Sequence, residues 1–422
     1  MNAAEAIRIT DLAAPQHTDF AKEVLRAVAD VQTDLSVSAL NKAASAQLGS
    51  VPVYEDPEFL ERVSVVCAAM EADTDQSPMG RMTNAGILTR YLVQRSLLEE
   101  LYRRHPEIAD EEIIRPIIIA GLPRSGTTHL LNLISVDKRL RSLQYWESLE
   151  PVPPLEESAA TQGEDPRIGR CREQLDLLNQ IMPLFRNMHE MTPEHIHEEV
   201  ELAGMDFSTM LFDTYGILPD WRDYYLSHDQ TPHYEFMKKA LKALQWMRGP
   251  RRWILKSPQH VEQLIPLHKV FPDATYVLTH RDPVSVVTSM VTMQAYVARM
   301  SRDPVRPQAI AQYWSDRVVR QLQACVRDRD ILPPEQTRDV MFHQFMANDV
   351  ATVEQIYLQA DHPMTDVVRA AMERYMEENP RGKHGAIIYD LYADFGLQPE
   401  SLYEQFQFYF DRFAVHRERS AA

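Results

Sequence analysis

The loop between residues 121 and 128, "GLPRSGTT", has the residue types that bind an anion. Gly121 and Gly126 have the G-x-x-x-x-G spacing that lets a backbone wrap around a phosphate. A nucleoside triphosphatase carries Lys and then Ser or Thr after the second glycine, whereas this chain carries Thr127 and Thr128. The cation of the loop is instead Arg124. These residues favour one phosphate that carries a further oxyanion group over a magnesium-bound triphosphate.

The segments on either side of this loop predict a strand and a helix. "PIIIA" (116–120) is a short apolar run typical of a buried strand, and "TTHLLNLIS" (127–135) is typical of a helix. Backbone N–H groups and the helix dipole then face an anion at the helix start. The hydroxyls of Ser125, Thr127 and Thr128 add further donors. A tight turn with a threonine cap would explain the glycine spacing alone, but the whole string after an apolar strand is more specific.

Two further basic segments could bind a second anion. "HRDPVSVVTS" (280–289) leaves a predicted strand, and its Arg281 lies eight residues before Ser289. Arg281 can grip a phosphate with two hydrogen bonds, or it can form an ordinary salt bridge with a nearby carboxylate. The second segment, "NPRGKHGA" (379–386), is either a close-approach loop or a solvated basic turn. Its binding candidates are Arg381, Gly382 and Lys383.

Alternating strands and helices predict an α/β fold with a central parallel sheet flanked by helices. Besides 116–120, strands are predicted at 251–256, 274–280 and 339–345, each followed by a helical pattern. We expect a helical N-terminal segment (1–110), an α/β domain (111–398) and a C-terminal helix with a tail (399–422). A mostly helical insert at about 140–250 is expected to cap the sheet edge where ligands bind in such folds.

The string "PRSGTT" in this context resembles the 5′-phosphosulfate loop of the sulfotransferases that use PAPS, 3′-phosphoadenosine 5′-phosphosulfate. The resemblance covers roughly residues 115 to 395 and implies a P-loop-type three-layer fold. Cytosolic members carry Lys where this chain has Arg124, whereas tyrosylprotein and many bacterial members carry Arg. The resemblance assigns Arg281 and Ser289 to the 3′-phosphate of PAPS. The segment 379–386 is similar to the family's R-K-G loop, although the order of its residues differs.

Sulfuryl transfer needs groups that stabilise the sulfonate and a base that takes the acceptor proton. Arg124 and Lys256, which ends the second strand in "WILKSPQH", are our candidates for the first role. Lys256 matches the family's lysine at this strand end. His260, predicted on the first helical turn, and Glu147 in "YWESLEPVPP" are the two candidate bases, with His260 slightly favoured. The family's K-x-H pattern has Pro258 in the histidine slot here, and tyrosylprotein sulfotransferases place a glutamate near the position of Glu147.

The segment "TPEHIHEE" (192–199) reads as a capped helix with His195 and Glu199 on one face. That spacing can hold a metal, but no third ligand lies at a persuasive distance in the sequence. A solvated face or part of an acceptor pocket is the favoured interpretation, and no metal is expected.

Composition limits the other function classes. The chain has 422 residues and a net charge of −17, which argues against general binding to nucleic acid or an anionic membrane. Three widely spaced cysteines, the lack of a signal-peptide core and short apolar runs favour a cytoplasmic protein without a membrane span. A homodimer is plausible.

The sequence therefore predicts a PAPS-dependent sulfotransferase, with adenosine 3′,5′-bisphosphate (PAP) as the second product. The many Met, Leu, Tyr and Phe residues of the cap, including "GMDFSTMLFDTYG" (204–216), suggest a hydrophobic small molecule or lipid with a hydroxyl as acceptor. The alternatives are a small-molecule kinase with a degenerate phosphate loop that uses ATP and magnesium, and an inactive nucleotide-binding scaffold.

Overall fold

Five parallel strands form the central sheet of the computed structural model, which describes residues 6–158, 163–380, 383 and 385–418. In spatial order the strands are β3 (Leu140–Arg141), β4 (Arg252–Ser257), β2 (Ile117–Gly121), β5 (Thr275–His280) and β6 (Thr337–Met341). Four of them lie where the sequence predicts strands, although the segment predicted as a strand at 339–345 is strand only to Met341 and helical from Phe342. The α/β fold with a central parallel sheet is therefore confirmed, and only the two-residue β3 was not predicted.

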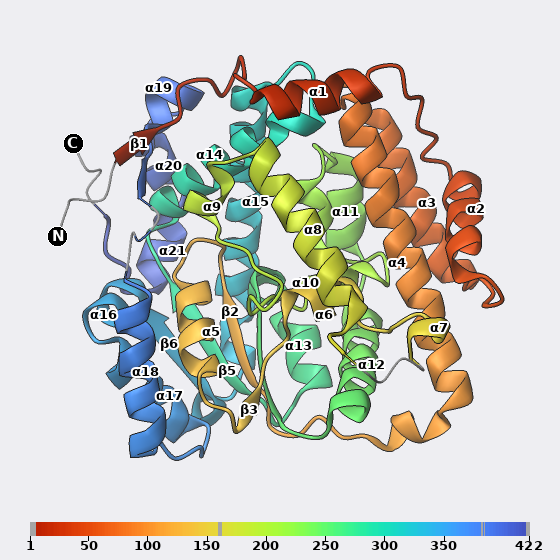
Figure 1. Cartoon of the computed structure of the whole chain (residues 1–422). Coiled ribbons are helices and arrows are strands. Elements are labelled where there is room, and N and C mark those ends of the chain that lie inside the picture. The colour runs from red at the N-terminus through yellow and green to blue at the C-terminus, as the bar shows by residue number, and fades with distance from the viewer. Residues whose placement is uncertain (1–5, 159–162, 381–382, 384, 419–422) are drawn as a thin grey trace.

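Both faces of the sheet are covered, which makes three layers (Figure 1). Ile117 and Ile119 of β2 enter one hydrophobic core, and Ile118 and Ala120 enter the other, because successive side chains of a strand point to opposite faces. The first core is completed by α5 (Thr127–Ser135), α17 (Asp349–Gln359) and α18 (Asp366–Glu378). The second is completed by α12 (Thr231–Arg248), α13 (Leu264–Val270) and α15 (Pro307–Asp328).

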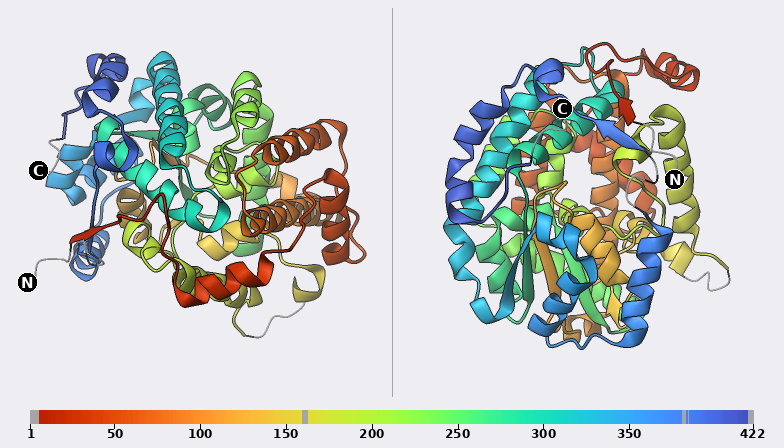
Figure 2. Two further views of the ribbon diagram at one scale, coloured as in Figure 1. Left: turned by 90° about the horizontal axis from the view of Figure 1, so that it is seen from above. Right: turned by 90° about the vertical axis from the view of Figure 1, so that its left-hand side faces the viewer.

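The N-terminal segment is helical, as the sequence predicts. Its helices are α1 (Asp19–Val28), α2 (Val37–Leu48), α3 (Pro57–Ala72) and α4 (Pro78–Arg104). Side-chain caps and prolines define their starts: Ser77 accepts from the N–H of Gly80 before Pro78, and Asp56 caps α3 in the same way. These helices share one hydrophobic core with α12, α14 (Pro283–Ser301) and α15. They lie at the opposite end of the molecule from α17 and α18 (Figure 2).

The insert between β3 and β4 is mostly helical. Its helices are α6 (Tyr145–Leu149), α7 (Leu155–Ser158), α8 (Pro166–Ile181), α9 (Phe185–Met188), α10 (Val200–Gly204), α11 (Pro219–Ser227) and α12. The predicted helix at 192–199 is wrong. Ile196 instead forms an antiparallel bridge with Gln144, and α10 begins only at Val200.

The chain after β4 forms two short helices, whereas the chain after β5 forms one long helix. The single helix expected after β4 is a short 3₁₀ helix, Pro258–Glu262, followed by α13. The helix after β5 is α14 (Pro283–Ser301), whose first N–H groups are capped by the Asp282 side chain. After β6 the chain forms α16 (Phe342–Ala347) before α17.

A strand in the C-terminal part pairs with the strand near the N-terminus. β7 (Ala386–Ile388) pairs in parallel with β1 (Ala6–Arg8), and α19 (Leu391–Phe395) follows. The single helix predicted near the C-terminus is two, α20 (Pro399–Gln405) and α21 (Gln407–Arg412), which break at Phe406. No helix in the described ranges has the length and apolar character that crossing a bilayer requires.

Candidate active site

The loop after β2 has the backbone geometry of an anion-binding turn. Gly126 has φ 87°, a conformation that disfavours other residues, and a Cβ there would lie 3.1 Å from the ring of Phe342, which would have to shift slightly. A Cβ on Gly121 would collide with the side chain of Thr279 on the neighbouring strand β5. Backbone conformation thus favours glycine at 126, and packing favours it at 121. They bring the start of α5 to the carboxyl edge of the sheet, where ligands bind in such folds.

The hydroxyl groups of the loop do not all face outward. Ser125 Oγ donates to the Leu122 carbonyl at 2.6 Å and lies 2.9 Å from Thr279 Oγ1, so it holds the loop to β5. Thr127 is buried as well. Thr128 keeps accessible surface and lines a pocket together with Arg124. The ligand-facing donors at this end are therefore Thr128, Arg124 and the first N–H groups of α5.

Arg124 joins the two predicted anion sites. Its Nε donates to Ser289 Oγ at 2.9 Å, and its Nη1 donates to the Met188 carbonyl at 2.6 Å. The guanidinium of Arg281 in turn donates to the backbone carbonyl of Arg124. This arrangement follows from the sheet, because β2 and β5 are neighbours and pair from Ile117 to Gly121. Residues 165 positions apart in sequence thus meet at one sheet edge.

Arg281 makes a two-point contact with the C-terminal tail. Its Nε and Nη2 donate to the carboxylate of Glu418 at 2.6 and 2.7 Å. The guanidinium also stacks over Phe342, with 4.1 Å between the Arg281 carbon and the ring centre. Burial raises the pKa of Asp282, which also accepts hydrogen bonds from Tyr403 and from the N–H of Glu418. Arg281 thus presents its two-donor edge to an anionic group.

The third predicted basic segment is described only in part. Arg381 and Gly382 lie outside the described residues. Lys383 forms an ion pair with Glu190 at 3.0 Å and lines the same pocket as Arg124. Lys383 therefore lies at the same pocket as the loop that the sequence predicts to bind the anion.

Lys256 ends β4 beside the anion loop. It pairs in register with Ile119 of β2, two residues before Gly121. Its side chain is buried and its Nζ forms an ion pair with Glu198, while its N–H donates to Glu199 Oε2 at 2.9 Å. The acidic pair Glu198–Glu199, predicted to belong to a helix, thus packs as irregular chain over the end of β4.

The two candidate bases lie in different surroundings. His260 is 1% exposed, and its ring nitrogens contact Glu199 Oε1 at 2.7 Å and Tyr234 OH at 2.8 Å. Glu147 contacts Arg141 at 2.9 Å and Arg248 at 3.5 Å. It lines a different pocket, of about 260 Å³, on the β3 side of the sheet. Both side chains thus have charged or hydrogen-bonding partners of their own within the fold.

Three histidines of the insert lie beside Lys256 and were not grouped by the sequence. The ring centres of His189 and His195 are 5.3 Å apart, and those of His195 and His197 are 6.0 Å apart. Burial, helped by the positive charges of Arg124 and Lys256, lowers the pKa of His189 well below its usual value. Burial and Lys256 lower the pKa of His195 to about 4. We call His189, His195 and His197 the histidine cluster.

The alternation in "HIH" was the sequence signal for this cluster. In an extended segment, residues 195 and 197 share one side and residue 196 the other. Ile196 accordingly packs against the core that includes α5, while both histidines lie close enough to Lys256 for its charge to lower their pKa values. The helical interpretation paired His195 with Glu199, but in the structure Glu199 bonds to His260 and to the N–H of Lys256.

A pocket of about 310 Å³ brings several of these groups together. It is lined by Arg124, Thr128, His129, Asn132, Asn187, Met188, His189, Glu190, His195, Tyr375, Asn379, Pro380, Lys383 and Gly385. Among the residues that the structure describes, no group of three or more His, Cys, Asp or Glu side chains is arranged to hold a metal ion.

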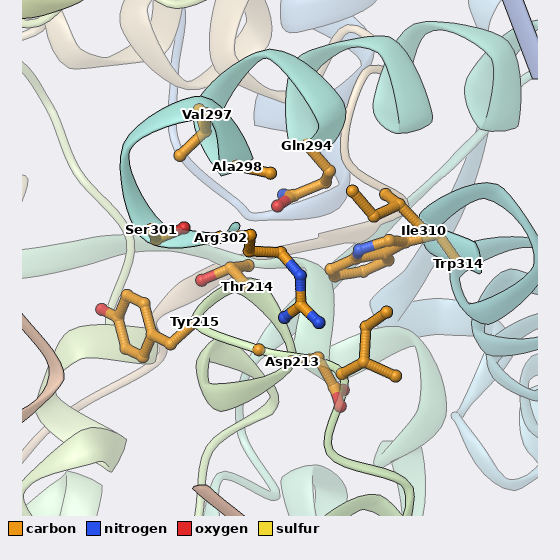
Figure 3. Close-up of a pocket in the computed structure, with 12 residues that line it drawn as sticks. Asp213, Thr214, Tyr215, Gln294, Val297, Ala298, Ser301, Arg302, Ile310 and Trp314 are labelled. Carbon is orange, nitrogen blue, oxygen red and sulfur yellow. The ribbon is translucent and has the colours of Figure 1, made fainter. Parts of the chain in front are cut away.

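A second hollow lies between α14, α15 and the 3₁₀ turn at Met210–Thr214 (Figure 3). Figure 3 shows the Arg302 side chain reaching into it beside Trp314. Its volume is about 30 Å³, which is room for about one water molecule. This hollow is too small for a substrate, and the candidate active site is the pocket at the anion loop.

Comparisons with known proteins identify the family of the chain. A model of the sulfotransferase family matches residues 116–366, which is more than half of the chain and includes Arg124, Lys256 and Arg281. The chain belongs to the sulfotransferase family.

Two solved structures of mycobacterial sulfotransferases resemble the chain over most of its length. Sulfotransferase STF9 from Mycobacterium avium is 25% identical and superposes with a TM-score of 0.80, covering 92% of this chain and 99% of that one. Sulfotransferase STF1 from Mycobacterium tuberculosis H37Rv is 25% identical, with a TM-score of 0.76 and coverage of 89% and 99%. The comparison with curated proteins gave no match. The shared fold therefore includes the N-terminal helices as well as the α/β part.

Proposed function

We propose that this sulfotransferase takes its sulfonate from PAPS and transfers it to a hydroxyl group of a hydrophobic small molecule or lipid. The observation that carries the proposal is the hydrogen bond of 2.9 Å between Arg124 and Ser289. It joins the loop suited to a 5′-phosphosulfate to the motif suited to a 3′-phosphate. A ligand with two anionic ends on one ribose fits such a pair of adjacent sites.

The donor set of the two sites supports an anionic ligand without a metal. Arg124 and the start of α5 face one group, and the two-donor edge of Arg281 faces a second. Lys256 lies close enough for its charge, together with that of Arg124, to act on His189. Arg124 and Lys256 can therefore stabilise the charge that develops on the sulfonate and on the leaving phosphate.

The kinase alternative has less support. The family match is to sulfotransferases, and the loop lacks the lysine that reaches the β and γ phosphates of ATP. We therefore retain ATP with magnesium only as the comparison ligand in the test.

Support for a hydrophobic acceptor comes from aromatic rings near the histidine cluster and not from residues 204–216. Most apolar side chains of residues 204–216 are core residues, including Met205, Phe207 and Phe212. The aromatic rings that border the histidine cluster are Tyr145, 4.6 Å from His197, and Phe185, 6.1 Å from His189. These rings can contact the flat or apolar body of an acceptor.

The first experiment is calorimetric titration of the purified protein with PAP and with ATP, each with and without magnesium. Tight, metal-independent binding of PAP with weak binding of ATP is the expected result. Preference for ATP with magnesium would contradict the proposal. A screen with PAPS then compares phenols, sterols, lipid alcohols and a charged glycan, and activity on the glycan alone would refute the hydrophobic acceptor.

A further inference from the structure

The histidine cluster lies at the pocket of the anion loop, and none of its members has a role in the function proposed above. His189 and His195 line the pocket together with Arg124 and Thr128. His197 is a ring neighbour of His195, and its Nδ1 is buried with no hydrogen-bond partner in the part of the chain that the structure describes. Because this atom is buried and the pocket lining includes His195, His195 is the member of that pair that can reach a ligand.

The backbone holds two members of this cluster rigidly. The carbonyl of His195 accepts from the N–H of Tyr145 at 2.8 Å, and the N–H of His197 donates to the Leu143 carbonyl at 2.8 Å. These bonds flank the Gln144–Ile196 bridge. The backbone that carries these two imidazole rings is therefore tied to the segment that leaves β3. Such fixed placement is what a group in direct contact with a reacting atom requires.

The charges around His195 come from three different segments. Lys256 at the end of β4 acts on it with a positive charge, and Glu190 in the loop after α9 acts with a negative one. His189 and His197 are its ring neighbours. Glu190 is itself paired with Lys383. Since burial and Lys256 keep the His195 ring neutral near pH 7, it has a free lone pair for a proton.

We propose that His195 is the catalytic base that takes the proton of the acceptor hydroxyl. This assignment rests on the proposed function. It differs from the sequence-based candidates because His260 is enclosed by Glu199 and Tyr234, whereas His195 borders the pocket that contains Arg124.

The transfer step balances with these groups alone. The acceptor oxygen forms a bond to the sulfur of PAPS while its proton moves to a ring nitrogen of His195. The bond from sulfur to the bridging oxygen breaks, and that oxygen leaves with the electron pair as part of the 5′-phosphate of PAP. The imidazolium then loses its proton to solvent through the pocket.

A bound nucleotide prepares His195 for this role. The negative charge of the 5′ group offsets the positive charge of Lys256, and so raises the pKa of His195 from about 4 toward neutrality. A histidine near neutrality is a better proton acceptor than one with a pKa of about 4.

The first test needs no acceptor. Histidine ring signals followed by NMR during pH titration should show His195 titrating near pH 4 in the free protein and roughly one unit or more higher with PAP bound. His195→Gln identifies the signal. An identical titration with and without bound PAP would place His195 away from the ligand and overturn the assignment.

The second test measures PAP release from PAPS, with 2-naphthol as acceptor or with water in its absence. His195→Ala and His195→Gln should each lower the turnover rate by about a hundredfold to a thousandfold, while the Kd of PAP stays within about twofold. Added imidazole should restore part of the rate to His195→Ala. The matched control is His228→Ala, which removes an exposed histidine at the end of α11.

The results distinguish a failure of the proposed function from a failure of the assignment of His195 as the base. A wild-type protein that neither binds PAP nor releases it from PAPS would remove the proposed function. A wild-type protein that does both, with unchanged turnover in the two His195 variants, would overturn the base assignment only. A larger loss in His189→Ala than in His195→Ala, without rescue by imidazole in the latter, would also overturn it.

Discussion

Arg281 and Glu418 form a bidentate ion pair, with hydrogen bonds of 2.6 and 2.7 Å between the guanidinium and the carboxylate. A phosphate presents two oxygens to arginine with the same geometry. The tail that carries Glu418 is fixed nearby, since its N–H donates to Asp282 at 2.6 Å and Arg417 lies over the ring of Tyr403. Glu418 therefore occupies the edge of Arg281 that the sequence assigns to the 3′-phosphate.

Glu418→Gln should strengthen the binding of PAP, because the nucleotide then displaces a neutral side chain from Arg281. Both partners are partly exposed, so the gain should be no more than about fivefold in Kd. Calorimetric titration at low salt measures it, and Glu400→Gln on the exposed side of α20 is the matched control. An unchanged Kd would mean that the tail and the nucleotide do not compete.

Arg281→Ala should weaken PAP more than adenosine 5′-phosphate, which lacks the 3′ group. Loss of a two-point charged contact should raise the Kd of PAP by about ten- to a hundredfold. Adenosine 5′-phosphate should change by less than about threefold, since it uses the Arg124 loop. Equal losses for the two nucleotides would refute the assignment of Arg281 to the 3′-phosphate.

The sequence predicted the parts of the site that local patterns define. The apolar run 116–120 and the run ending at Lys256 became adjacent strands, because buried parallel strands are continuous apolar segments. The loop at Gly126 and the start of the helix after β5 also follow from residues within a few positions of each other. These features determine where Arg124, Lys256 and Arg281 lie.

Long-range contacts determined what the sequence did not predict. β1 and β7 pair across almost the whole chain, and each has three residues of which two are exposed, so neither gives a run long enough to predict a buried strand. Glu418 reaches Arg281 only through the folded C-terminal helices. The histidine cluster was missed because 192–199 has spacings that suit a helix as well as an extended segment. The antiparallel bridge between Gln144 and Ile196 holds the segment in the extended form.

Lys256→Ala should lower turnover while leaving nucleotide binding intact. Removing a fixed cation at the transferred group costs about a hundredfold to a thousandfold in rate. PAP lacks the sulfonate, so its Kd should stay within about twofold. Steady-state PAP release and calorimetry give the two values, with Lys242→Ala as control, since this half-buried lysine of α12 donates to the Ala109 carbonyl. Normal turnover in a folded Lys256→Ala protein would remove this residue from the mechanism.

His260→Ala should destabilise the fold more than it affects chemistry. The ring fills a buried position between Glu199 and Tyr234, and its loss leaves the Glu199 carboxylate without one of its partners. The free energy of unfolding should fall by about 3 kcal/mol, as measured by urea denaturation. If the variant keeps full stability but loses turnover, His260 is the base, as the sequence first suggested.

Asp137→Asn should reduce stability at neutral pH but not in acid. Burial acts to raise the pKa of Asp137, but hydrogen bonds from His362 at 2.9 Å and Arg139 at 2.6 Å outweigh it and hold the pKa well below its usual range. A carboxyl group with a lowered pKa contributes stability above its unfolded pKa of about 4, and this stability is lost as the pH falls below that value.

The wild-type protein should therefore exceed Asp137→Asn by about 2 kcal/mol in the free energy of unfolding at pH 7, and the difference should shrink steadily below about pH 4. Urea denaturation of both proteins at a series of pH values measures it. Asp110→Asn is the control, because that side chain is exposed in the turn before β2 and should show no such trend. A difference that grows as the pH falls would have the wrong sign for a carboxylate stabilised in its charged form.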